Sequence, residues 1–138
     1  MSEISSATIT AYQETDYRVL GRPPFTLRIG EASEPLAKLL RQHETNCAAF
    51  ITACNPFSRK LDEATNAARQ AKLAQELAQR GLGFVTGEGK HPCDDWAEPS
   101  FLALGLSLEE AKELGRRYDQ NAVVWCGSDT VPKLVLLR

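Results

Sequence analysis

Polar side chains stand beside four apolar runs of this sequence, at positions where a strand would end or begin. Asn55 and Ser58 follow the run 47–54, and Glu98 stands just before the run 100–104. Amides, hydroxyls and carboxylates bind polar ligands through hydrogen bonds, and a carboxylate also acts as a general base or a metal ligand. The candidates that we select for a ligand site are Asn55, Ser58, Glu88, Trp96, Glu98, Ser100 and Gln120.

Each candidate also has a purely structural interpretation. An Asn-Pro dipeptide is an ordinary turn, and Asn55 and Ser58 are as typical of capping as of function. Trp96 suits a lid over a core as well as a platform for a ligand. Glu98 would be unremarkable as a solvated carboxylate, whereas a buried carboxylate needs a partner. Gln120 stands where a helix ends and a strand begins, although its amide also suits a polar ligand.

The N-terminal part of the chain predicts two short strands and a helix. Residues 17–20 and 25–29 are rich in strand formers, and the Gly-Arg-Pro-Pro segment between them cannot continue a strand, so we expect a hairpin. Ser33 is a typical helix cap, and the leucines of 36–40 recur at helical spacing. This pattern predicts a helix that ends near His43. The residues before the hairpin have no clear pattern.

The rest of the chain predicts strands and helices in alternation. The continuous apolar run 47–54, stopped by an Asn-Pro pair, indicates a central strand. The Ala- and Leu-rich stretch 61–80 predicts a long helix that Gly81 closes. The further predicted elements are a strand at 82–86, a polar loop at 87–97, a strand at 100–104, a helix with a Ser107–Glu110 capping box, a strand at 121–126 and an edge strand at 133–137.

The order of these elements predicts the fold class. From residue 47 to 126 the order is strand, helix, strand, strand, helix, strand, which is the split βαβ arrangement of ferredoxin-like folds. We therefore expect one α+β domain over residues 1–138, with the N-terminal hairpin and helix and the C-terminal strand beside that core. In this topology the ends of the first two core strands meet the starts of the last two. The candidate residues would then converge at one end of the sheet, each held by a rigid element.

Composition sets limits on the class of protein. The chain has 138 residues, 43% of them hydrophobic and 25% charged, which is typical of a globular domain. It contains no apolar run of roughly 18 residues, the length that a membrane helix needs. Residues 1–10 lack a basic stretch followed by an apolar run, so we expect no secretory signal and a cytoplasmic protein. The net charge of −2 gives no general attraction for nucleic acid or anionic membranes.

Several other motifs are too incomplete to define a site. The four cysteines contain no C-x-x-C pair, so we expect reduced thiols and no zinc site. The glycines of 81–89 match neither a Walker loop nor G-x-G-x-x-G, although a backbone nest for an anion stays open. His91 and Cys93 are a weak candidate for a base and a nucleophile. The acidic group Glu88, Asp94, Asp95 and Glu98 has the oxygen ligands that Mg²⁺ prefers, or is a solvated loop.

A set of short motifs connects the sequence to a family. The motifs, in chain order, are Ala11-Tyr12 with Tyr17, Thr52-Ala53, Asn55-Pro56 with Ser58, Asn66, Trp96 with Glu98 and Ser100, and Gln120-Asn121-Ala122. Together they resemble the bacterial family known as domain of unknown function 3293, from about Ala11 to Leu137. The resemblance implies a stand-alone cytosolic bacterial protein and supplies no activity, substrate or cofactor. It marks most of the candidate residues again, but Cys54 stands where the family favours a larger, often aromatic, residue.

Three functions from different classes follow as hypotheses. The first is a binding domain for a small polar ligand, such as a nucleotide or a fragment of one, at the strand-end cleft. The second is an enzyme in which Glu98 is a general base, or a metal ligand together with Glu88 or Asp94. The third is a protein-interaction module that recruits a partner through the edge strand 133–137. Of these, the convergence of amide, hydroxyl and carboxylate groups favours ligand binding. The sequence indicates no particular cofactor or oligomeric state.

Overall fold

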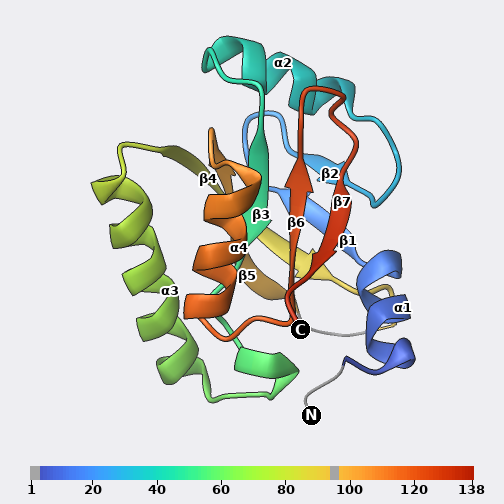
Figure 1. The fold of residues 1–138 in the computed structure, drawn as a ribbon, viewed down its shortest axis with the longest axis vertical. Coiled ribbons are helices and arrows are strands. Elements are labelled where there is room, and N and C mark those ends of the chain that lie inside the picture. Colours follow the sequence, from blue (N-terminus) through green and yellow to red (C-terminus); the bar gives the residue numbers. More distant parts are fainter. Residues whose placement is uncertain (1–3, 94–96) are drawn as a thin grey trace.

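The computed structural model of the protein describes residues 4–93 and 97–138. Over these residues the chain is an α+β fold of four α-helices, one short 3₁₀ helix and seven strands (Figure 1). In chain order the elements are α1 (Ser6–Glu14), β1 (Asp16–Val19), β2 (Phe25–Leu27), α2 (Glu34–Gln42), β3 (Ala48–Ile51), η1 (Pro56–Ser58), α3 (Glu63–Gln79), β4 (Gly83–Lys90), β5 (Glu98–Leu104), α4 (Leu108–Arg117), β6 (Ala122–Cys126) and β7 (Lys133–Leu136).

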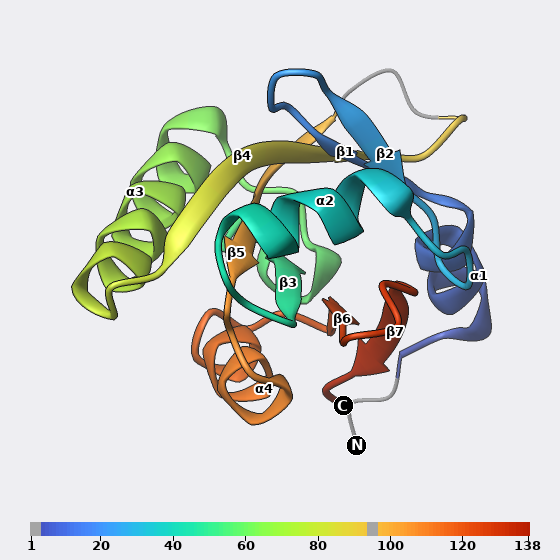
Figure 2. The ribbon, with the colours of Figure 1, turned by 90° about the horizontal axis from the view of Figure 1, so that it is seen from above.

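The seven strands form one antiparallel sheet in the order β2-β1-β4-β5-β3-β6-β7. The sheet is curled into a half-barrel, and Figure 2 shows α2 at one open end of it, with α3 and α4 outside. Backbone bonds from Gly30 N to Pro132 O (2.9 Å) and from Ser33 N to Thr130 O (3.1 Å) connect the two sides of the sheet at the α2 end. The strands therefore enclose a concave face that α2 covers at one end.

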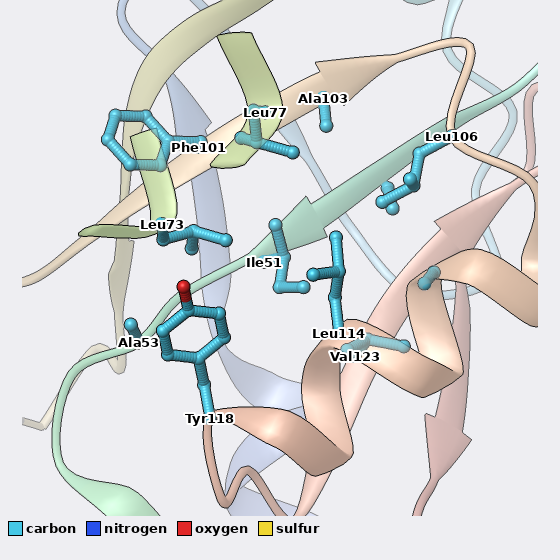
Figure 3. Close-up of a cluster of buried hydrophobic side chains, with 12 residues drawn as sticks. Ile51, Ala53, Leu73, Leu77, Phe101, Ala103, Leu106, Leu114, Tyr118 and Val123 are labelled. Carbon is cyan, nitrogen blue, oxygen red and sulfur yellow. The ribbon is translucent and has the colours of Figure 1, made fainter. Parts of the chain in front are cut away.

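Alternating side chains of β3 supply two hydrophobic cores. Ala49 and Ile51 point to the outer face, where Ile51 lies beside Leu73 of α3 and Leu114 of α4 (Figure 3). Ala48 and Phe50 point to the concave face, where they join the apolar residues of α2 in a second cluster. All four residues of β3 are buried, which explains its continuous apolar sequence, since a strand covered on both faces does not alternate.

Several predictions made from local patterns are confirmed. The hairpin pairs Tyr17 with Leu27, and Ser33 caps α2 by accepting a hydrogen bond from Leu36 N at 3.2 Å. Both reciprocal bonds of the capping box at Ser107 are present. Strand β7 pairs with β6 and lies at the edge of the sheet. None of the helices in the described part of the chain is long and apolar enough to span a membrane.

Two parts of the prediction were wrong. The segment predicted as a polar loop at 87–97 begins as strand, because β4 continues to Lys90 and β5 already starts at Glu98. Its two glycines resemble a loop sequence, but its first part is flanked by β1 and β5 and pairs with both. The irregular N-terminus contains α1, which Ser5 caps and which buries no residue completely, so its sequence carries no apolar stripe.

Gly87 of β4 is required by a close approach of the neighbouring strand. A Cβ atom there would stand 2.6 Å from the carbonyl oxygen of Arg18 and 2.9 Å from the ring of Phe50. We expect Gly87→Ala to lower the free energy of unfolding by about 1 to 2 kcal/mol, as overpacked sites do. The matched control is Gly89→Ala in the same strand, where the nearest atom lies at 3.7 Å. Urea titration of both variants measures the difference, and equal stabilities would contradict the steric explanation.

Candidate functional site

A cavity of about 240 Å³ is lined by residues of α1 and of the concave face of the sheet. Figure 1 shows α1 toward the end of the sheet opposite α2. The apolar wall of the cavity includes Tyr17, Phe50 and Val124, from three different strands. Five of the predicted site residues also line it: Asn55, Ser58, Glu98, Ser100 and Gln120. They come together because β3 lies between β5 and β6 and is antiparallel to both, which places the end of β3 beside the starts of its neighbours.

Asn55 is held by hydrogen bonds on every polar group that it offers. Its side-chain oxygen accepts from Leu61 N (3.0 Å) and from Asn66 Nδ2 (2.8 Å), and its backbone N–H donates to Asn66 Oδ1 (2.9 Å). The amide nitrogen donates to Glu98 Oε2 at 2.9 Å. Asn55 has a left-handed backbone with φ of 48°, which Asn tolerates better than most residues. The turn therefore presents one donor to Glu98 in a fixed direction.

Glu98 begins β5 with its carboxylate on the cavity wall. It pairs directly with Gly89 of β4, which has no side chain to cover it. Burial raises the pKa of Glu98 to about 7, and the hydrogen bond from Asn55 opposes that rise. No ion pair to Glu98 is formed among residues 4–93 and 97–138. Near neutral pH this carboxyl group can therefore both accept and donate a proton.

Tyr12 attaches α1 to the rest of the site. Its hydroxyl bonds Ser58 Oγ at 2.5 Å and accepts a hydrogen bond from Asn121 Nδ2 at 3.0 Å. Asn121 Oδ1 in turn accepts from Arg138 Nη1 at 2.8 Å, and the Tyr17 hydroxyl donates to the backbone oxygen of Tyr12 at 2.6 Å. These bonds join α1, the turn after β3, the start of β6 and the end of the chain. They fix the helix that forms one side of the cavity.

Gln120 and Ser100 combine structural bonds with a place on the cavity wall. Gln120 Nε2 donates to the backbone oxygens of Cys54 (3.0 Å) and Tyr118 (3.2 Å), so the turn after α4 is tied to the end of β3. Its side-chain oxygen is then the atom with which it can accept a bond from a ligand. Ser100 Oγ donates to the backbone oxygen of Glu98 at 3.0 Å. These bonds hold Gln120 and Ser100 in place on the wall of the cavity.

Glu88 is not among the residues that line the cavity. It pairs across the sheet with Arg18, and the two side chains form a salt bridge of 3.1 Å. Because β4 continues past the predicted end of the strand, side-chain alternation turns Gly89 toward the cavity and Glu88 to the opposite face. Trp96, Asp94 and Asp95 lie outside the described residues.

The arrangement of the described residues supports neither a metal site nor a nucleophile formed by His91 and Cys93. In residues 4–93 and 97–138, no three His, Cys, Asp or Glu side chains are grouped so as to hold a metal ion. His91 lines the cavity, but its Nδ1 accepts from the backbone N–H of Cys93 (3.1 Å), and its Nε2 bonds Glu14 Oε1 (3.2 Å). The ring therefore contacts the backbone of Cys93 rather than positioning its thiol.

Reasoning from strand ends missed the wall that α1 and its C-cap contribute, namely Ala11, Tyr12 and Thr15. The sequence contains one weak signal for this helix, namely Ser5, a residue type that often caps helices. In the structure its side chain accepts a hydrogen bond from the N–H of Thr8 at 3.2 Å. Tyr12 and Tyr17 also belong to the motifs that carry the family resemblance.

Comparison with known proteins gives a family without a described activity. The model of the family described as "Protein of unknown function (DUF3293)" matches residues 51–123, which include Asn55, Glu98 and Gln120. No curated protein and no solved structure matches the chain.

Proposed function

The chain belongs to the DUF3293 family of proteins of unknown function, and on the geometry of its own residues we propose that it binds a small polar ligand in the cavity beside α1. The observation that carries this proposal is the Asn55–Glu98 pair. The Glu98 carboxylate is withdrawn from water and oriented by the side-chain amide of Asn55, and it lies on a cavity wall. Burying a carboxylate in this way costs folding free energy, and a role in binding explains why the protein keeps it there.

The lining of the cavity supports a ligand with one apolar and one polar side. Tyr17 and Phe50 meet edge to face, with ring centroids 5.2 Å apart, and form part of an apolar wall. Glu98, Ser58 and His91 supply polar groups on the same cavity. Ligand pockets are typically apolar with a few polar groups in fixed positions. This combination favours a small ring with polar substituents.

The volume of the cavity limits the size of the ligand. At about 240 Å³ it is smaller than the roughly 300–1,000 Å³ of pockets that take drug-sized molecules. We therefore expect a nucleobase, a nucleoside or another molecule of similar size rather than a dinucleotide.

We also infer that residues 48–126 form a split βαβ core of ferredoxin-like type. The order β4-β5-β3-β6 and the packing of α3 and α4 in one core cluster support this inference. The same order accounts for the site, because it makes β3 the neighbour of both β5 and β6.

A carboxylate-based enzyme is the second candidate function. The raised pKa of Glu98, about 7, matches what a general base needs at neutral pH. The version in which Glu98 binds a metal together with Glu88 has less support, since Glu88 is paired with Arg18 and does not line the cavity.

Filling the cavity tests the binding proposal. Ala122 lines the cavity at the start of β6, so we expect Ala122→Phe to occupy the space and weaken ligand binding at least tenfold. The matched control is Ala68→Phe, at an exposed position of α3 outside the cavity, which should bind as the wild-type protein does. The measurement is ligand-observed NMR with a library of nucleobases, nucleosides and small polar ring compounds. If no compound binds the wild-type protein, or if binding survives Ala122→Phe unchanged, the proposal is wrong.

A further inference from the structure

We propose that the ligand presents a protonated amine or an amidine to Glu98, an inference that rests on the binding function proposed above. Its basis is the position of this carboxylate, which lies on a largely apolar cavity wall with the aromatic rings of Tyr17 and Phe50 on the same cavity.

Counting hydrogen bonds shows what Glu98 still requires. A carboxylate offers about four acceptor positions on its two oxygens. Asn55 Nδ2 fills one of these, on Oε2. The hydroxyl of Ser100, which lines the same cavity, donates to the backbone oxygen of Glu98 and not to the carboxylate. One neutral donor offsets little of the free energy that a carboxylate loses when it is removed from water. A cation with several N–H groups offsets most of it, because it supplies both opposite charge and hydrogen bonds.

The surroundings of Glu98 indicate both the charge and the shape of the ligand group that would bind it. No Lys, Arg or His among residues 4–93 and 97–138 forms an ion pair with Glu98, and Lys60 is the lysine that lines the same cavity. An anionic group placed beside Glu98 would meet like charge. An amidine carries two parallel N–H groups that match a carboxylate in bidentate geometry. The neighbouring aromatic wall accommodates the small ring that carries such a group.

A series of four probes of similar size and different charge tests the inference. Benzamidine and benzylamine are cations at pH 8, benzyl alcohol is neutral and benzoate is an anion. Dissociation constants are measured by NMR titration with the wild-type protein, Glu98→Gln and Glu88→Gln. We expect the two cations to bind at least tenfold more tightly than benzyl alcohol and benzoate. Glu98→Gln should remove this preference, and Glu88→Gln, on the opposite face of the sheet, should keep it within about twofold.

The dependence of binding on pH supplies a second readout. Because Glu98 has a pKa of about 7, the ionised fraction rises about tenfold between pH 6 and pH 8, and affinity for benzamidine should rise with it. The other titratable side chains that line the cavity are Tyr12, Tyr17, Lys60 and His91, and the side chains of Glu14 and Lys90 contact His91. All of these are retained in Glu98→Gln, so a rise that persists in that variant would come from them and would contradict the inference.

The outcomes separate this inference from the binding function. If benzoate or benzyl alcohol binds in the cavity as well as the cations do, or if Glu98→Gln leaves benzamidine binding intact, the cationic ligand is excluded while the binding function stands. If none of the four probes binds, the cationic ligand is excluded too. The compound library of the preceding test, read with Ala122→Phe, then decides whether the cavity binds any ligand.

Discussion

The Glu98→Gln variant should be more stable than the wild-type protein at pH 8 by about 3 kcal/mol and close to it at pH 4. The reason is the raised pKa of Glu98, which is about 7 in the folded protein against an ordinary value of 4.5. A carboxyl group with a raised pKa favours folding fully below pH 4.5, and its contribution is lost as the pH rises to about 7. The shift of pKa corresponds to the stated free energy. Glutamine is neutral throughout, so the variant loses nothing over this range.

The measurement is the free energy of unfolding from urea titrations at pH 4, 5, 6, 7 and 8. Glu88→Gln is the matched control, since it also replaces a glutamate by glutamine near the same end of the sheet but leaves Glu98 in place. It should keep the fall in stability with pH, apart from a small loss from the exposed salt bridge to Arg18. A Glu98→Gln protein that falls in parallel with the wild type would show that the carboxylate is well solvated in the folded state.

Asn55→Ala should lower the free energy of unfolding by about 3 to 4 kcal/mol. The substitution removes three side-chain hydrogen bonds, with Leu61 N, Asn66 Nδ2 and Glu98, and leaves partly buried partners unsatisfied. It also places alanine at a φ of 48°, which costs roughly a further 1 kcal/mol. Asn55→Gly avoids that backbone cost and should therefore be the more stable of the two variants. Thermal and urea unfolding of both variants measure the difference.

A double-mutant cycle with Asn66→Ala isolates the bond between the two side-chain amides. Asn66 Nδ2 donates to Asn55 Oδ1 at 2.8 Å, and each single variant removes this same bond, so the double variant should lose less stability than the sum of the single ones. The Asn55 side chain also lowers the pKa of Glu98 against the effect of burial. NMR titration of the Glu98 carboxyl should therefore find a higher pKa in Asn55→Ala than in the wild type. Additive stabilities and an unchanged pKa would contradict the bonding scheme.

The parts of the site that the sequence predicted depend on chain direction and local pattern. The run 47–54 stops at an Asn-Pro pair, and Gln120 stands between a capped helix and an apolar run, so both mark strand ends without tertiary information. Given the order of elements, antiparallel pairing brings Asn55, Glu98 and Gln120 to one end of the sheet. The cavity lined by all three agrees with that expectation. Whether they bind a ligand is the question that the experiments above address.

The parts that the sequence did not predict depend on which face of a strand each residue occupies. A polar loop was expected from residue 87, and its side chains would have had no fixed face. In the structure β4 runs on to Lys90, and the alternation of an extended strand turns Gly89 toward the cavity and Glu88 toward Arg18. Helix α1 was missed because it buries no residue fully and is held by specific polar contacts of Tyr12.

The sequence by itself determined the secondary structure of the central strands and their helices, the places where those strands end and the polar residues that stand there. These properties follow from periodicity, capping and turn residues, which act between neighbours in the chain. Tertiary structure alone decided that the seven strands curl around a cavity, that α1 closes one side of it, and that Glu98 loses enough water to titrate near pH 7. Desolvation and enclosure arise from segments far apart in sequence, so no local pattern encodes them.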